Sequence, residues 1–147
     1  MKDEQPKAEW HLQVETDMKA LTSVLEWWDN IVLPGLPADF QWPWQCRLII
    51  AEGFTNVVRH AHQNLPPATL IDLEVKVFAD YLEIRIWDRG QPFKLEAKLH
   101  SIMQEKLDPS NQVGGRGLVF MYKLTDDLRY IRTDDLRNCL VMRKNIT

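Results

Sequence analysis

Two neighbouring segments in the middle of the chain alternate between apolar and polar residues. Their apolar positions are Ile71, Leu73, Val75, Val77, Leu82, Ile84 and Ile86. A period of two places these side chains on one face of a sheet, and the short connection Ala79-Asp80 predicts an antiparallel hairpin. Similar alternation predicts a strand at residues 10–14 and a last hairpin near residues 128–133 and 138–143, which turns at Asp134-Asp135.

Three further segments carry apolar residues at helical spacing. The first follows Thr16 or Asp17, either of which could cap it, and its stripe consists of Met18, Leu21, Val24, Leu25, Trp28 and Ile31. The second is residues 44–62, where the apolar residues fall within a sector of about 100°, namely Ile50, Phe54, Val57, Val58 and Ala61. The third is residues 118–124, which follow a cluster of glycines.

These elements predict an α+β fold. We expect a two-layer sandwich in which a mostly antiparallel, mixed sheet is covered on one face by helices. A chain of 147 residues can bury a core without disulfides or metals, so residues 1–147 are predicted to form a single domain. The proline-rich residues 34–43 are expected to be a loop. The polar residues 91–113 are expected to be a long mobile segment with a helical stretch at 94–107.

Charge and composition narrow the function classes. The formal net charge is -3, which argues against direct binding of nucleic acid because that function favours a basic face. Cys46 and Cys139 fit no zinc-binding spacing and are expected to be reduced thiols. No apolar run approaches membrane-spanning length, and the residues after Met1 form no apolar signal region. We therefore expect a cytoplasmic protein that does not contact a membrane.

Polar residues of the second predicted helix form a candidate catalytic row. Glu52 and Asn56 lie one turn apart, opposite the apolar sector. A side-chain amide oxygen suits Mg²⁺, and a nearby carboxylate can accept a proton from an attacking hydroxyl or water. His60 continues the row and could contact a nucleotide. A solvated polar helix face would have the same spacing, and a surface histidine is common, so both interpretations stay open.

Asp88 is the candidate residue for binding a purine base. It is in phase with Ile84 and Ile86, so its carboxylate is expected to point toward the core side of the sheet. A buried carboxylate needs hydrogen-bond donors, and the exocyclic amino group of a purine is one such donor. Gly90 would let a flat ring approach the backbone. An aspartate that turns the chain at a strand end would look the same.

The glycine cluster Gly114-Gly-Arg-Gly117 is a candidate phosphate site. It immediately precedes the apolar helix that begins at Leu118, and the free N–H groups of a helix N-terminus bind anions. The cluster has neither the Walker spacing nor the dinucleotide-binding spacing. Arg116 could contact phosphate or remain solvated, and a flexible turn is the alternative for the whole cluster.

Taken together and in this order, the three segments resemble the ATP-binding fold shared by DNA gyrase, heat-shock chaperones, the mismatch-repair protein MutL and histidine kinases. Within that superfamily the chain resembles the bacterial anti-sigma factor serine/threonine kinases over roughly residues 10–143. The similar segments are Glu52-Gly-Phe-Thr-Asn-Val-Val-Arg-His60, Asp88-Arg-Gly-Gln-Pro-Phe93 and Gly114-Gly-Arg-Gly-Leu118. The resemblance implies a histidine-kinase-like ATPase fold with ATP and Mg²⁺ as cofactors.

The resemblance also assigns roles to individual residues. It implies that Asn56 binds Mg²⁺, that Glu52 acts as a base or orients the nucleophile, and that Asp88 binds adenine with Gly90 below the ring. Residues 91–113 would contain the ATP lid, and Gly115 and Gly117 would hold phosphates. The full set of expected nucleotide-binding residues is Asn56, His60, Asp88, Gly90, Gly114, Gly115, Arg116, Gly117 and Leu118.

The function implied by the resemblance is that of a Mg-ATP-dependent kinase. Such a kinase phosphorylates a serine on an anti-anti-sigma partner of the STAS fold and sequesters a sigma factor when that partner is not available. Homodimerisation is also consistent with the resemblance. The alternative is an ATP-responsive protein-binding module with little or no kinase activity, because the presence of Glu52 favours catalysis without proving it.

Overall fold

The computed structural model describes residues 4–104 and 116–146. Within these residues, five strands form one sheet with the order β1-β2-β3-β5-β4, and every pairing is antiparallel. The strands are β1 (Ala8–Glu15), β2 (Leu70–Val77), β3 (Tyr81–Asp88), β4 (Asp127–Arg132) and β5 (Asn138–Asn145). The predicted antiparallel sheet is thus confirmed, and the described strands contain none of the parallel pairs that a mixed sheet would include.

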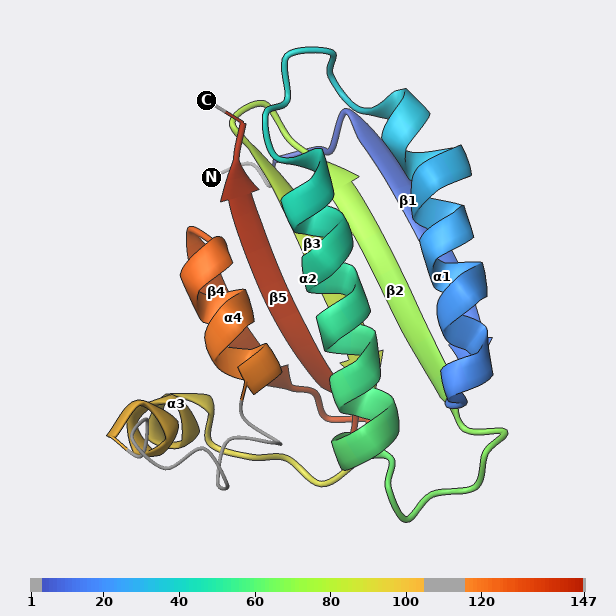
Figure 1. Ribbon diagram of the computed structural model, residues 1–147, viewed down its shortest axis with the longest axis vertical. Coiled ribbons are helices and arrows are strands. Elements are labelled where there is room, and N and C mark those ends of the chain that lie inside the picture. Colours follow the sequence, from blue (N-terminus) through green and yellow to red (C-terminus); the bar gives the residue numbers. More distant parts are fainter. Residues whose placement is uncertain (1–3, 105–115, 147) are drawn as a thin grey trace.

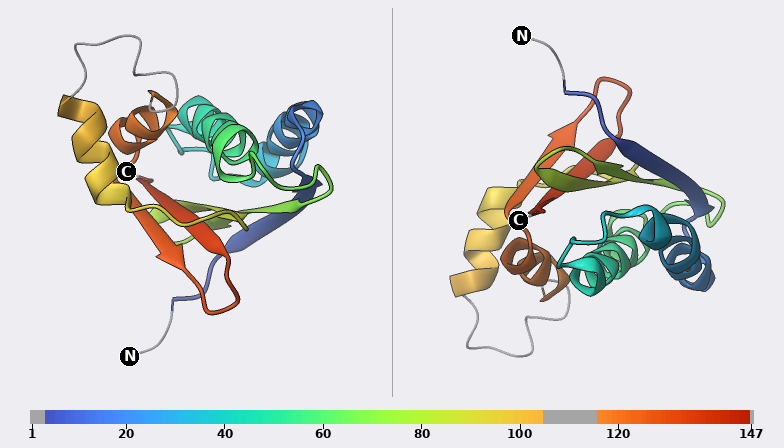
Figure 2. Two further views of the ribbon diagram at one scale, coloured as in Figure 1. Left: turned by 90° about the horizontal axis from the view of Figure 1, so that it is seen from below. Right: turned by 90° about the horizontal axis from the view of Figure 1, so that it is seen from above.

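Helices cover one face of this sheet, and the opposite face stays open (Figures 1 and 2). The α-helices are α1 (Leu21–Trp27), α2 (Pro43–Asn56), α3 (Leu95–Gln104) and α4 (Arg116–Leu124). The shorter helical turns are η1 (Met18–Ala20), η2 (Trp28–Val32), η3 (Leu33–Gly35) and η4 (Val57–Ala61). In Figure 1, α1, α2 and α4 run along the sheet, whereas α3 lies beyond its edge. The predicted two-layer α+β fold is therefore confirmed.

The central hairpin follows its sequence pattern. β2 and β3 pair in the register that places Val75 opposite Ile84. All seven predicted inward residues of this hairpin are at most 3% exposed. The strands fold this way because alternation makes one face of each strand apolar, and this face is buried under the helices.

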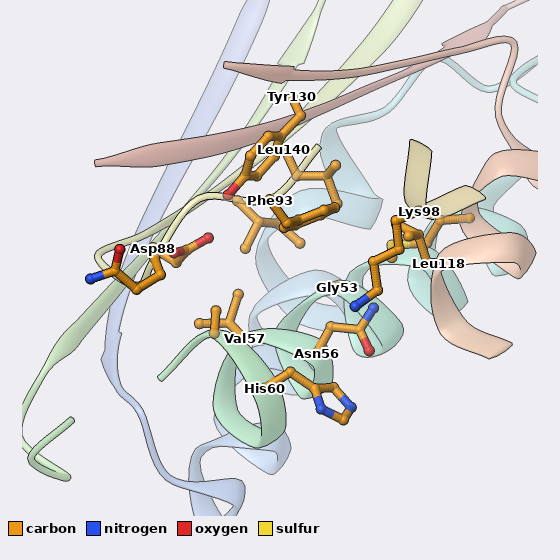
Figure 3. A pocket seen from close by; sticks show the side chains of 14 residues that line it. Gly53, Asn56, Val57, His60, Asp88, Phe93, Lys98, Leu118, Tyr130 and Leu140 are labelled. Atoms are coloured by element: carbon orange, nitrogen blue, oxygen red, sulfur yellow. The ribbon is translucent and has the colours of Figure 1, made fainter. Parts of the chain in front are cut away.

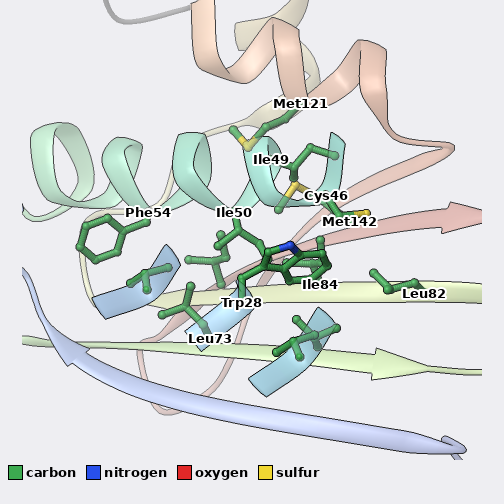
Figure 4. Packing of buried hydrophobic residues seen from close by; sticks show 14 of the residues in the cluster. Trp28, Cys46, Ile49, Ile50, Phe54, Leu73, Leu82, Ile84, Met121 and Met142 are labelled. Atoms are coloured by element: carbon green, nitrogen blue, oxygen red, sulfur yellow. The ribbon is translucent and has the colours of Figure 1, made fainter. Parts of the chain in front are cut away.

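The core lies between the sheet and α2, with contributions from η2 and α4 (Figure 4). Trp28, Ile49, Ile50 and Phe54 are each at most 1% exposed. At Gly53 the helix comes so near β3 that a methyl group would lie 2.3 Å from Cδ1 of Ile86. The glycine therefore sets how deeply α2 packs on the sheet, and α2 carries the candidate catalytic row.

Two helices widen into π turns at their C-terminal ends. α1 continues as η2, where the N–H of Leu33 donates to the carbonyl of Trp28. A π turn contains more residues than an α turn, so Val32 becomes the buried residue and Ile31 is 55% exposed. The prediction that Ile31 continues the buried stripe was wrong for this reason.

None of the helices in residues 4–104 and 116–146 combines the length and apolar composition of a membrane span.

Candidate functional site

A cavity of about 210 Å³ opens between the end of α2, the end of β3 and the helices α3 and α4 (Figure 3). Its polar residues lie at separate places on the wall, and apolar and aromatic side chains lie between them. The described residues that line it are Gly53, Asn56, Val57, His60, Ala61, Ile86, Asp88, Gln91, Phe93, Lys98, Leu118, Met121, Tyr130 and Leu140. This mixture of an apolar wall and a few polar groups is typical of a small-molecule site.

Asp88 is buried on the core side of the sheet, as its strand phase predicts, with 6% of its surface exposed. Its Oδ1 accepts hydrogen bonds from the backbone N–H of Gly90 at 2.8 Å and from Nδ2 of Asn138 at 2.9 Å. Both of these bonds end on Oδ1, so Oδ2 is the oxygen available to a ligand. A carboxylate oxygen accepts only, which suits the amino group of a purine.

The turn after Asp88 is held from two sides. Nδ2 of Asn138 also donates to the carbonyl of Gly90 at 2.8 Å, and Arg132 donates to the same carbonyl at 3.2 Å and to Oδ1 of Asn138 at 3.0 Å. On the helix side, a methyl group at Gly90 would lie 2.2 Å from the carbonyl oxygen of Ala61. Glycine is needed at position 90 because the turn lies directly against the backbone of η4.

His62 forms a second link between the helix and this turn. Its side chain is 2% exposed, and Nε2 accepts the backbone N–H of Arg89 at 2.8 Å. Burial lowers the pKa of His62, the nearby Asp88 opposes that change, and Arg89 adds to it. The neutral ring is therefore favoured, and only the neutral ring can accept this hydrogen bond through Nε2.

Aromatic side chains form the wall beside Asp88. The rings of Phe93 and Tyr130 lie 4.4 Å apart between centroids. Burial, together with the charge of Asp88, raises the pKa of Tyr130 to about 12. Tyr130 is therefore a neutral phenol at physiological pH. Flat apolar surfaces next to a buried acceptor suit a planar heterocycle that carries an amino group.

The first turn of α4 lies directly against the candidate catalytic row of α2. A methyl group at Gly117 would lie 2.7 Å from Oε2 of Glu52 and 3.2 Å from Oδ1 of Asn56. The π turn η4 begins immediately after Asn56. Its i→i−5 hydrogen bond runs from the N–H of His62 to the carbonyl of Val57 at 2.8 Å. Glu52 and Asn56 are thus together, as predicted, but only Asn56 reaches the cavity wall.

Two further polar side chains line the cavity near Asn56. His60 is exposed on the outside of η4 and lines the cavity beside Asn56 (Figure 3). Lys98 extends from α3 into the same region, and its Nζ lies 5.6 Å from the centroid of Phe93. This end of the cavity therefore presents an amide, an imidazole and an ammonium group.

The structure describes the glycine cluster in part. Gly114 and Gly115 lie outside the described residues, and so do residues 105–113 of the predicted lid. Arg116 is the first residue of α4. Leu118 is 4% exposed and lines the cavity. The helix predicted at 94–107 is observed as α3, which begins at Leu95.

The residues at the Asn56 end fit a magnesium-bound nucleotide phosphate. Mg²⁺ usually takes one or two protein oxygens and completes its shell with phosphate and water oxygens, so the amide oxygen of Asn56 is a suitable ligand. No cluster of three or more His, Cys, Asp or Glu suited to a metal occurs in the part of the chain that the structure describes. The side chains of Glu52 and Asn56 pack against the bare Cα of Gly117, and the N-terminus of α4 offers N–H groups.

Sequence reasoning missed several residues of this site. They are His62, Phe93, Lys98, Tyr130, Arg132 and Asn138. A buried polar partner for Asp88 could have been sought on a neighbouring strand, because a carboxylate on the core side must be satisfied. The sequence carries no comparable signal for Lys98, which resembles the other lysines of its segment.

Comparisons with known proteins identify relatives of this chain. The chain is similar to the serine-protein kinase RsbW of Listeria innocua serovar 6a, with 29% identity over 86 residues that cover 56% of this chain and 54% of that protein. It is similar to the serine-protein kinase RsbW of Staphylococcus epidermidis, with 26% identity over 113 residues that cover 63% of this chain and 68% of that protein.

The chain thus spans about half the length of the Listeria relatives it matches. The resemblance to bacterial serine kinases that the motifs indicated is confirmed by these relatives. A family model described as the histidine kinase-like ATPase domain matches residues 14–144, which is most of the chain. Fold, cavity and family model agree, and the chain belongs to the histidine kinase-like ATPase domain family.

Proposed function

We propose that this chain is a Mg-ATP-dependent serine/threonine protein kinase that acts as an anti-sigma-type regulatory switch. The observation that carries the proposal is the cavity itself. Asp88 offers Oδ2, which accepts no hydrogen bond from the described residues, beside aromatic walls, and Asn56 lies with the first turn of α4 at the other end. These two ends match the base and the phosphates of an adenine nucleotide.

The proposed reaction transfers the γ-phosphoryl group of ATP to a serine hydroxyl of a partner protein. The serine oxygen forms a bond to phosphorus, the bond from phosphorus to the bridging oxygen breaks, and ADP leaves. Glu52 accepts the hydroxyl proton or orients the hydroxyl. Asn56 contributes its amide oxygen to Mg²⁺, which neutralises phosphate charge when bound. Catalysis then rests on positioning and charge rather than on a covalent intermediate of the protein.

The nucleotide is expected to lie along the cavity with adenine at Asp88. Gly90 and Gly117 are expected to allow close approach of the backbone to the nucleotide, and Leu118 provides an apolar contact on the cavity wall. His60 lies beside the phosphates. The described part of the proposed lid segment, residues 91–104, contributes Phe93 and Lys98 to the wall.

The partner follows from the family resemblance rather than from any surface of the chain. We propose an anti-anti-sigma protein of the STAS type as the phosphate acceptor, a sigma factor as the alternate partner, and a homodimer in the cytoplasm as the working unit. Each is a separate claim, and co-purification with a tagged chain followed by mass spectrometry tests them together.

A single-turnover assay with radiolabelled ATP tests the kinase. The purified chain is mixed with Mg-ATP and a candidate STAS protein, and we expect label on a serine of that protein. A STAS variant in which the acceptor serine is alanine is the control and should stay unlabelled. If ATP binds but no label reaches any partner, the kinase proposal is wrong.

The substitution Asn56→Ala tests the assigned metal ligand. We expect the affinity for Mg-ATP to fall about tenfold or more, because an interaction with a charged group contributes about 1.5–3 kcal/mol. Asn64→Ala is the matched control, since Asn64 is exposed beyond the end of the same helix. Calorimetry with and without Mg²⁺ measures both variants. An unchanged magnesium dependence in Asn56→Ala would contradict the assignment.

One observation favours the alternative, an ATP-responsive protein-binding module with little or no kinase activity. Glu52 lies with Asn56 against Gly117 but is not among the described residues that line the cavity. A carboxylate in that place can stabilise the start of α4 without touching an acceptor hydroxyl. The single-turnover assay separates the two functions, because the module binds ATP and partner but transfers no phosphate.

A further inference from the structure

We propose that Lys98 of α3 binds the phosphate groups of the nucleotide. This inference rests on the proposed function. It names a phosphate-binding residue outside the glycine cluster and outside the row on α2. It also assigns a ligand contact to α3, whose sequence carries no recognisable motif.

The position of Lys98 in the cavity wall supports this proposal. Among the described residues that line the cavity, Lys98 is the only lysine or arginine. Figure 3 shows its side chain extending into the cavity on the side of Asn56, away from Asp88. If adenine binds at Asp88, the phosphates lie at the end where Lys98 points.

The negative charge around the site also favours a cation near the proposed phosphates. The described walls of the site carry the carboxylate of Asp88, and the carboxylate of Glu52 lies just behind Asn56. A nucleoside triphosphate such as ATP adds further negative charge to this region. A single magnesium ion offsets part of that charge, and a lysine on the facing helix offsets more.

Lys98 has no competing ion-pair partner in the described part of the chain. None of the ion pairs between described residues includes it. Its only described side-chain interaction is the contact with the ring of Phe93. A cation over an aromatic ring at an exposed site is weak, so the ammonium group can turn to a phosphate at little cost. Phe93 keeps it near the cavity in the meantime.

A series of ligands tests the proposal. The affinities of ATP and adenosine are measured for the unmodified chain, Lys98→Ala, Lys98→Arg and the control Lys94→Ala. Lys94 is exposed one turn before Lys98 and does not line the cavity. Calorimetry follows ATP, and chemical-shift titration follows adenosine.

We expect Lys98→Ala to lower the ATP affinity about tenfold, as loss of one charged hydrogen bond predicts. The adenosine affinity should stay unchanged, Lys98→Arg should recover most of the loss, and Lys94→Ala should behave like the unmodified chain. An ATP affinity within twofold of the unmodified chain overturns the inference. An equal loss for adenosine also overturns it, because it would indicate a structural role. If the unmodified chain binds no ATP, the proposed function itself is wrong.

Discussion

Asn138→Ala tests the network that fixes the orientation of Asp88. Asn138 is completely buried on β5 and pairs with Asp88 across the ladder. It donates two hydrogen bonds, at 2.9 Å to Asp88 and at 2.8 Å to the carbonyl of Gly90, and it accepts one from Arg132 at 3.0 Å. Alanine removes all three bonds.

The loss can be estimated bond by bond. A buried hydrogen bond contributes about 1 kcal/mol, and one to a charged group contributes somewhat more. Asp88 keeps the N–H of Gly90, and the carbonyl of Gly90 keeps Arg132, so neither group becomes fully unpaired. We therefore expect the free energy of unfolding to fall by about 3 kcal/mol. For a chain of this size that is a decrease in melting temperature of about 6–12 °C.

Chemical denaturation and calorimetry measure this change, with Asn145→Ala as the control. Asn145 is exposed on the same strand, and its substitution should cost less than about 0.5 kcal/mol. The affinity for ATP should also fall in Asn138→Ala, because the carboxylate of Asp88 would be free to rotate. If both asparagine variants unfold alike, the network does not stabilise the turn. If ATP affinity is unchanged, Asp88 does not bind the base.

Two more substitutions test the contact between α4 and α2 and the pH dependence of the stability of the fold. Gly117→Ala should reduce both ATP affinity and phosphate transfer, since its methyl group would lie 2.7 Å from Oε2 of Glu52 and 3.2 Å from Oδ1 of Asn56; unchanged affinity and transfer would contradict the packing of α4 against these two residues. The second concerns His62, whose pKa is lowered in the folded state. The unfolded chain then binds more protons below about pH 6.5, so stability falls as the pH drops through that range. Melting curves should show this loss weakened in His62→Gln and retained in His11→Gln, which alters an exposed histidine.

Local patterns predicted the parts of the fold that depend on local periodicity. Alternation in residues 71–77 and 82–86 was sufficient for the central hairpin, because each strand buries a single apolar face. Helical phase was sufficient to place Glu52 with Asn56. Strand phase also turned Asp88 toward the core side. Each of these inferences needs only neighbours within a few residues of the chain.

Long-range pairing explains what the sequence did not reveal. Asn138 and Asp88 are 50 residues apart, and they meet only because β5 is inserted between β3 and β4 in the sheet. The π turns are a different case. η4 and η2 follow ordinary helical sequences, so local propensity does not indicate where a helix widens. Neither the strand order nor the widened turns can be read from periodicity.

The two ends of the cavity are constructed differently, and this bears on the choice between kinase and binding module. The Asp88 end is fixed by a buried hydrogen bond to β5 and by a part-buried one to His62, the residue after η4, so the proposed base would meet a preformed site. The phosphate end is assembled from side chains of α2, α3 and α4, including the exposed Lys98. Its geometry can therefore change with the phosphates bound while the base stays in place. Glu52 lies against the first turn of α4 and is not among the described residues that line the cavity. Because the same turn offers N–H groups to the proposed phosphates, we expect its position to affect both ATP binding and phosphate transfer.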